Sequence, residues 1–171
     1  MSKQAADPGA AQAHVELRRA RILDGVSRPL TPVAADAEPL PGEHLAFLRR
    51  EAEDLYWNEL SWEELTDEEL VAGGHLTEMV FPGFLAFVEG LLVDRAPADS
   101  LAPARPHPDA VEEVLTFLAE RCVELTAELE AGVDSQRVVW ARSMTCQLVD
   151  LVLYRLYRLS AAEREQLEAA P

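Results

Sequence analysis

Cysteine is scarce in this chain of 171 residues, which contains only Cys122 and Cys146. The two do not form a CxxC pair, and secreted scaffolds held by disulfides use more cysteines in shorter chains. We therefore expect two free thiols in helix interiors, packed in the hydrophobic core. The first residues lack the apolar segment of a secretory signal, which favours a cytoplasmic location.

Long hydrophobic runs and a surplus of basic charge are also missing. The longest apolar runs, 79–88 and 148–159, are interrupted by proline, glycine or charged residues, whereas a membrane span needs roughly 20 apolar residues. We expect no membrane span. The formal net charge of −16 argues against direct binding of nucleic acid, which requires a basic surface. The same charge favours solubility and suits a protein partner with a basic surface.

Neither a strand pattern nor an internal repeat is present. Apolar residues instead recur at three- and four-residue steps, which is typical of helices with one buried face. The segments with this pattern are 44–60, 75–93, 108–131 and 134–159. Capping boxes of the form S/T-x-x-E predict shorter helices that begin near residues 61, 66 and 160.

The prolines indicate how the chain is organised. A helical segment ends at Gly25 and carries several arginines, and Pro29, Pro32, Pro39 and Pro41 follow it, which predicts an extended linker or strap. The basic segment either folds back on the acidic body or reaches a partner. We predict an all-α fold with two parts: a partly flexible N-terminal arm and Pro-rich linker over residues 1–42, and a single-domain bundle of four to five helices over 43–171.

Two further features predict how these helices pack. Pro82 should kink the helix over 75–93, because its ring clashes with the carbonyl four residues earlier. The small residues Gly83, Ala86 and Gly90 lie on one stripe of that helix. We expect this stripe to face a neighbouring helix, so that Gly90→Leu would overpack the contact.

The short connection at Gly132 predicts that the helices over 108–131 and 134–159 form an antiparallel hairpin. Counting outward from the turn predicts two ion pairs between them, Arg137 with Glu128 and Arg155 with Glu112.

Six acidic residues are concentrated between Glu59 and Glu69. Acidic side chains stabilise helix N-termini, which is the structural interpretation. The alternative is a docking face, because Trp residues flank the cluster and are enriched at interfaces. The residues predicted to contact a partner are Trp57, Trp62, Glu63, Glu64, Asp67, Glu68 and Glu69. The segment lacks the alternating oxygen ligands of a calcium loop.

No residue pattern predicts a catalytic, cofactor or metal site. His75 and Glu78 reverse the Glu-x-x-His order of di-iron bundles, and zinc would require three or four His or Cys ligands. Cys146 lies in mid-helix, where a nucleophile needs an activating base. Arg155 and Arg158 either complement the end of their helix or clamp an anionic ligand.

The nucleotide-binding and hydrolase motifs GxGxxG, the P-loop and GxSxG are absent. The leading hypothesis is therefore a non-enzymatic helical interaction module, an accessory, adaptor or regulatory subunit that binds a protein partner without a cofactor. One alternative is a small-molecule-binding or metal-dependent helical enzyme with its pocket between 75–93 and 134–159. A further alternative is a nucleic-acid mimic that inhibits a DNA-binding protein. The sequence leaves homo-oligomerisation open.

Overall fold

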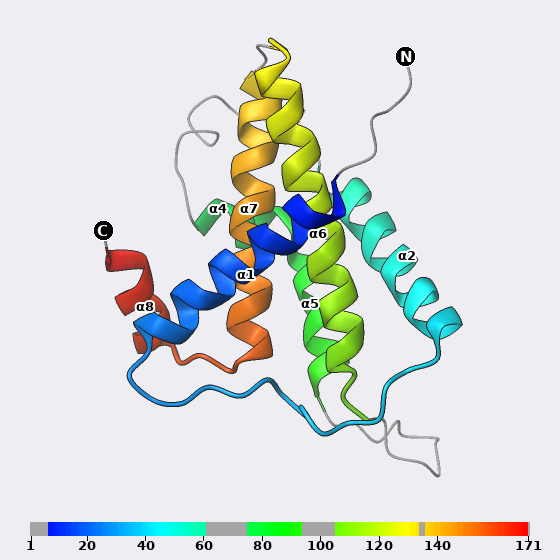
Figure 1. The fold of residues 1–171 in the computed structure, drawn as a ribbon, viewed down its shortest axis with the longest axis vertical. Coiled ribbons are helices and arrows are strands. Elements are labelled where there is room, and N and C mark those ends of the chain that lie inside the picture. Colours follow the sequence, from blue (N-terminus) through cyan, green and yellow to red (C-terminus); the bar gives the residue numbers. More distant parts are fainter. Residues whose placement is uncertain (1–6, 61–74, 94–104, 134–135, 171) are drawn as a thin grey trace.

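The fold is all-α, as predicted, in a computed structural model that describes residues 7–60, 75–93, 105–133 and 136–170 (Figure 1). The described residues form seven helices rather than the four or five expected for the bundle. The additional helices arise from the N-terminal arm, from a break at Pro82 and from a short C-terminal segment. The helices are α1 (Pro8–Gly25), α2 (Gly42–Glu59), α4 (His75–Val80), α5 (Pro82–Leu92), α6 (Pro108–Glu130), α7 (Gln136–Leu156) and α8 (Ala161–Ala169).

The central element is the hairpin of α6 and α7, which confirms the predicted pairing of these helices (Figure 1). Gly132 adopts a φ of +85°, a left-handed conformation that glycine accepts without steric cost and that ends α6. The Val133 N–H donates to the Glu128 carbonyl at 3.1 Å and tightens the turn.

The predicted ion pair between Arg155 and Glu112 is wrong. Arg155 lies beside Glu89 of α5 at 3.2 Å, and Glu112 binds Arg19 of α1 at 2.6 Å. Glu128 is contacted by Arg121 of its own helix. Neighbouring helices therefore take Arg155 and Glu112, because each helix of the hairpin is also covered by other elements, and the pair of Arg137 with Glu128 stays a prediction.

Tyr56 of α2 lies at the centre of the hydrophobic core and is fully buried. Its ring stacks on Phe81 at a centroid distance of 5.6 Å and meets Phe117 edge-on at 5.3 Å. Thr145 of α7 donates to the Ala141 carbonyl, so its hydroxyl oxygen accepts the Tyr56 O–H at 2.8 Å. This hydrogen bond satisfies a phenol that would otherwise be unpaired in the core.

Pro82 breaks the helix over 75–93, as predicted, and begins α5 after a non-helical Phe81. The first free amides of α5 are capped by Glu59, the last residue of α2. Its carboxylate accepts from the Gly83 N–H at 2.5 Å and from the Phe84 N–H at 2.7 Å. Glu59, counted above in the acidic cluster, therefore has a structural role.

The predicted small-residue stripe of α5 does not face another helix. Ala86 and Gly90 are exposed, and a Cβ atom added at Gly90 would meet no atom within 4 Å. Gly83 alone is closely approached, by the Glu59 carboxylate. The apolar face of α5 is instead formed by large residues such as Phe84 and Val88, which leave the small ones outside.

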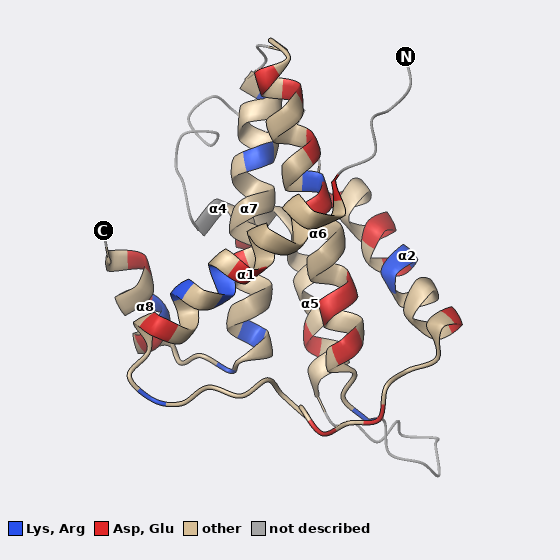
Figure 2. Ribbon diagram, in the orientation of Figure 1, with Lys and Arg blue, Asp and Glu red and all other residues tan. Residues whose placement is uncertain are grey.

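Helix α1 lies across α6 and α7 (Figures 1 and 2). The basic segment therefore folds back on the acidic body, the first of the two alternatives given above. Its buried residues Ala11, Val15 and Ile22 join the core. The arginines of this segment bind groups from other parts of the chain: Arg18 with Asp150, Arg19 with Glu112 and the Tyr157 hydroxyl, Arg21 with the Leu167 carbonyl, and Arg28 with Glu163.

Residues 26–41 form the predicted strap, which runs over the ends of the helices without regular structure (Figure 1). Val33 N–H donates to the Leu156 carbonyl at 2.8 Å, and Leu40 N–H donates to the Asp109 carboxylate at 2.6 Å. The proposed division of the chain after residue 42 stays a prediction.

At the C-terminus, the predicted capping box is confirmed. Ser160 accepts from the Glu163 N–H, and the Glu163 carboxylate accepts from the Ser160 N–H. The helix starts predicted near residues 61 and 66 lie outside the described residues. None of the described helices is long and apolar enough to cross a membrane.

Removing the Glu59 cap should destabilise the fold. We expect Glu59→Ala to lower the free energy of unfolding by about 1–2 kcal/mol, because two backbone donors at the start of α5 lose their acceptor. Glu51→Ala, an exposed position on the same helix, is the matched control and should change it by less than about 0.5 kcal/mol. Urea unfolding measures both, and equal midpoints for the two variants would contradict the capping role.

Candidate redox site

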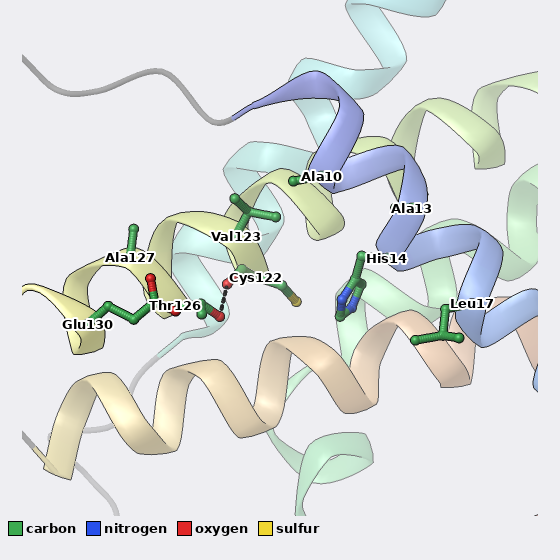
Figure 3. Close-up of a pocket in the computed structure, with 9 residues that line it drawn as sticks. All are labelled: Ala10, Ala13, His14, Leu17, Cys122, Val123, Thr126, Ala127 and Glu130. Carbon is green, nitrogen blue, oxygen red and sulfur yellow. Dashed lines mark hydrogen bonds between the residues drawn. The ribbon is translucent and has the colours of Figure 1, made fainter.

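The two cysteines and one histidine, distant in sequence, meet where α1 crosses the α6–α7 hairpin. One ligand-type atom from each of His14, Cys122 and Cys146 lies within 4.8 Å of the others. Figure 3 shows the His14 imidazole of α1 and the Cys122 sulfur of α6 directed toward one another. Each residue belongs to a different helix, so the cluster exists only in the folded chain.

The sulfur atoms of Cys122 and Cys146 share a hydrogen bond, with their Sγ atoms 3.1 Å apart. Both thiols are free, as expected. Their environments differ, because Cys122 is buried and Cys146 is only partly buried. Cys122 therefore belongs to the core, as expected, and Cys146 is partly buried and packs against it.

His14 is oriented by Arg18, one helical turn further along α1. The Arg18 Nε–H donates to His14 Nε2 at 3.1 Å, while its Nη1 group binds the Asp150 carboxylate at 2.7 Å. Since a guanidinium only donates, Nε2 is the accepting nitrogen, and in the neutral imidazole Nδ1 carries the proton. These two contacts fix the tautomer of the neutral His14 imidazole, with the proton on Nδ1.

These contacts separate the pKa values of the two thiols. The pKa of Cys146 is lowered far below its usual range, chiefly by hydrogen bonding with Cys122 and also by hydrogen bonding with His14 and the charge of Arg18. The same hydrogen bond, together with burial, raises the pKa of Cys122. Cys146 is therefore the more acidic thiol of the pair.

The donor set of one imidazole and two thiolates is that of a zinc ligand group, but the surroundings fit zinc poorly. Two sulfurs on a tetrahedral zinc ion lie about 3.8 Å apart, further than the 3.1 Å found here. A zinc-bound histidine donates its second N–H to an acceptor. Nε2 of His14 faces the donor Arg18 instead.

A pocket of about 420 Å³ opens beside the cluster between α1 and α6 (Figure 3). His14 and Cys122 lie on its wall, and most of the remaining wall is apolar. The other lining residues are Ala10, Ala13, Leu17, Val123, Thr126, Ala127 and Glu130. This volume falls within the roughly 300–1,000 Å³ typical of small-molecule sites.

Comparison with protein-family models, with curated proteins and with solved structures found no match. Any functional conclusion therefore depends on the geometry of the site.

The predicted docking face lies largely outside the described residues. Of its members, Trp57 alone is described, on α2, where its side chain is 49% exposed. The Arg121 guanidinium covers one side of its ring at 4.8 Å from the centroid. The others, Trp62, Glu63, Glu64, Asp67, Glu68 and Glu69, fall outside, and the docking face stays a prediction.

Selective alkylation tests the difference between the thiols. At about pH 6 iodoacetamide should modify Cys146 and leave Cys122 unmodified, because only a thiolate reacts and an ordinary cysteine has a pKa of about 8.5. Peptide mass spectrometry of the folded protein measures the two sites separately. Equal modification of both cysteines, or modification that begins only above about pH 8, would contradict the assignment.

Proposed function

We propose that the chain is a thiol-based redox protein, in which Cys146 attacks an oxidant and Cys122 then closes an intramolecular disulfide. The single observation that carries this proposal is the contact between the sulfur of the partly buried Cys146 and the sulfur of the buried Cys122. An attacking thiol must be ionised and accessible, whereas the second thiol needs only to lie beside it.

The class of oxidant follows from the position of Cys146 in the middle of α7. A disulfide of another folded protein would not readily reach a partly buried helical side chain, whereas a hydroperoxide is small enough.

The reaction consists of two successive nucleophilic substitutions. The Cys146 thiolate attacks the terminal oxygen of ROOH, the O–O bond breaks, and RO⁻ takes a proton from water to leave as ROH. Cys146 becomes a sulfenic acid. The Cys122 sulfur then attacks the Cys146 sulfur, the S–O bond breaks, and hydroxide leaves with the Cys122 proton as water. Two electrons pass from the two thiols to the peroxide.

The fold permits the second step with little rearrangement. The two sulfurs need to approach by only about 1 Å to reach the length of a disulfide bond. An external thiol would return the pair to the reduced state, which suits the cytoplasmic location inferred from the sequence.

Docking of a basic protein partner, the leading hypothesis from sequence, is a second candidate. It is favoured by the exposed Trp57 at the end of α2 that leads toward the acidic residues. The two candidates are compatible, since they share no residue.

Peroxide oxidation of the purified protein tests the redox function. One equivalent of hydrogen peroxide or of a small alkyl hydroperoxide should remove two hydrogens from the parent and link Cys122 to Cys146. Cys122→Ser should stop at the sulfenic acid, which dimedone traps, and Cys146→Ser should react no faster than free cysteine. Mass spectrometry follows all three, and the chain has no other cysteine to confuse the result.

The role of His14 has its own control. His14→Gln should slow the first step by about tenfold, the effect of losing one hydrogen bond to a charged group. His44→Gln, at an exposed histidine on α2, should leave the rate unchanged. A Cys146→Ser protein that reacts like the parent would overturn the proposal, as would a parent protein that is purified with a stoichiometric metal ion on the cysteines.

A further inference from the structure

Three arginines meet in a second pocket, at the end of α7 furthest from the hairpin turn. The pocket has a volume of about 180 Å³ and is lined by Glu89, Tyr154, Arg155, Arg158, Leu159 and Arg164. It shares no residue with the cysteine cluster. Figure 2 shows basic positions gathered where the end of α7 approaches α8, in a chain whose net charge is −16.

The pocket has three arginine side chains, and two carboxylates pair with them, Glu89 and Glu78. Glu89 is the one acidic residue of the lining, and it serves both Arg155 at 3.2 Å and Arg158 at 3.7 Å. Arg164 binds Glu78 at 2.6 Å and lies over the Tyr154 ring, with its guanidinium carbon 5.2 Å from the centroid. Tyr154 and Glu78 together hold the Arg164 guanidinium at the pocket wall.

Arg155 is largely buried and shares its one close carboxylate with Arg158. Its Nη1 group donates to the Leu151 carbonyl, and its buried Nε lies 3.2 Å from a Glu89 oxygen without the alignment of a hydrogen bond. Burial, together with the charge of Arg164, lowers the pKa of Arg155. An anion in the pocket would add negative charge beside a buried guanidinium that has only a shared carboxylate.

Arg158 occupies a backbone conformation that favours glycine. Its φ is +53°, and it follows directly on the last turn of α7, where the Leu159 N–H donates to the Tyr154 carbonyl. A side chain in this left-handed position carries a steric cost, so the contacts of the guanidinium must offset it. One contact is the Leu92 carbonyl at the end of α5, at 2.9 Å. The rest of the guanidinium remains half exposed at the pocket.

We propose that Arg155, Arg158 and Arg164 form a binding site for a phosphate group, as the inorganic ion or as the head of a small phosphomonoester. The guanidinium fork matches the geometry of phosphate oxygens, and three arginines against two carboxylates, Glu89 and Glu78, leave a positive charge that favours an anion. The volume is below that of sites that enclose drug-sized ligands, so the pocket accommodates the phosphate group and little beyond it.

Isothermal titration with sodium phosphate, in a chloride buffer of matched ionic strength, tests the site. The full-length parent should bind one equivalent saturably. Arg158→Gly, which relieves the backbone while removing the guanidinium, should weaken binding by about tenfold or more, as should Arg164→Gln. Arg50→Gln removes the same charge from an exposed position on α2 and should bind like the parent.

Glu89→Gln should have the opposite effect on phosphate affinity. Since Glu89 competes with the anion for two arginines, its neutralisation should tighten phosphate binding severalfold, whereas loss of a purely structural contact would not. Parallel titration with glycerol phosphate distinguishes the two ligand sources, because equal affinity identifies the phosphate group as the recognised element. The proposal is overturned if the parent shows no saturable binding, or if Arg158→Gly or Glu89→Gln binds phosphate as the parent does.

Discussion

The docking of α1 across the α6–α7 hairpin is the interaction on which the redox site depends. The hairpin alone brings Cys122 and Cys146 together, and the hydrogen bond between them is the chief cause of the lowered pKa of Cys146. Helix α1 adds His14, and Arg18 and Asp150 fix its imidazole in one orientation. The burial of Val15 and Ile22 and the ion pair of Arg19 with Glu112 hold the helix in place. The reactivity of Cys146 is thus a property of tertiary packing.

The docking of α1 also explains the role of some of the acidic residues. Acidic residues outnumber basic ones by 31 to 15, and the arginines of the N-terminal segment attach it to carboxylates on α7, α6 and α8. Each exposed pair contributes only about 0–1 kcal/mol, so the apolar contacts of α1 supply most of the attachment and the ion pairs set its register. The three arginines of the second pocket differ from those of the N-terminal segment, because they outnumber the two carboxylates that pair with them.

The local elements were predictable from the sequence because their causes are local. Periodicity located the long helices, Pro82 broke the helix that contains it, Gly132 made the turn, and Ser160 with Glu163 formed the capping box. The packing partners were less predictable. Arg155 faces Glu89 instead of Glu112, and the small stripe of α5 faces solvent, because both outcomes depend on elements distant in sequence. Counting outward from Gly132 places Cys122 roughly level with Cys146, and this was the one available signal of the thiol pair. No local pattern connects His14 with either cysteine.

The central claim is that Cys122, with His14 and Arg18 of α1, lowers the pKa of Cys146, and titration of thiolate absorbance in the far ultraviolet tests it most directly. The folded parent should show one thiolate already present at neutral pH, with the second appearing only in strong alkali or on unfolding. Because a hydrogen-bond donor is lost, His14→Gln should move the first transition upward toward the usual cysteine range of about 8.5. Two thiols that titrate near that range in both proteins would contradict the account.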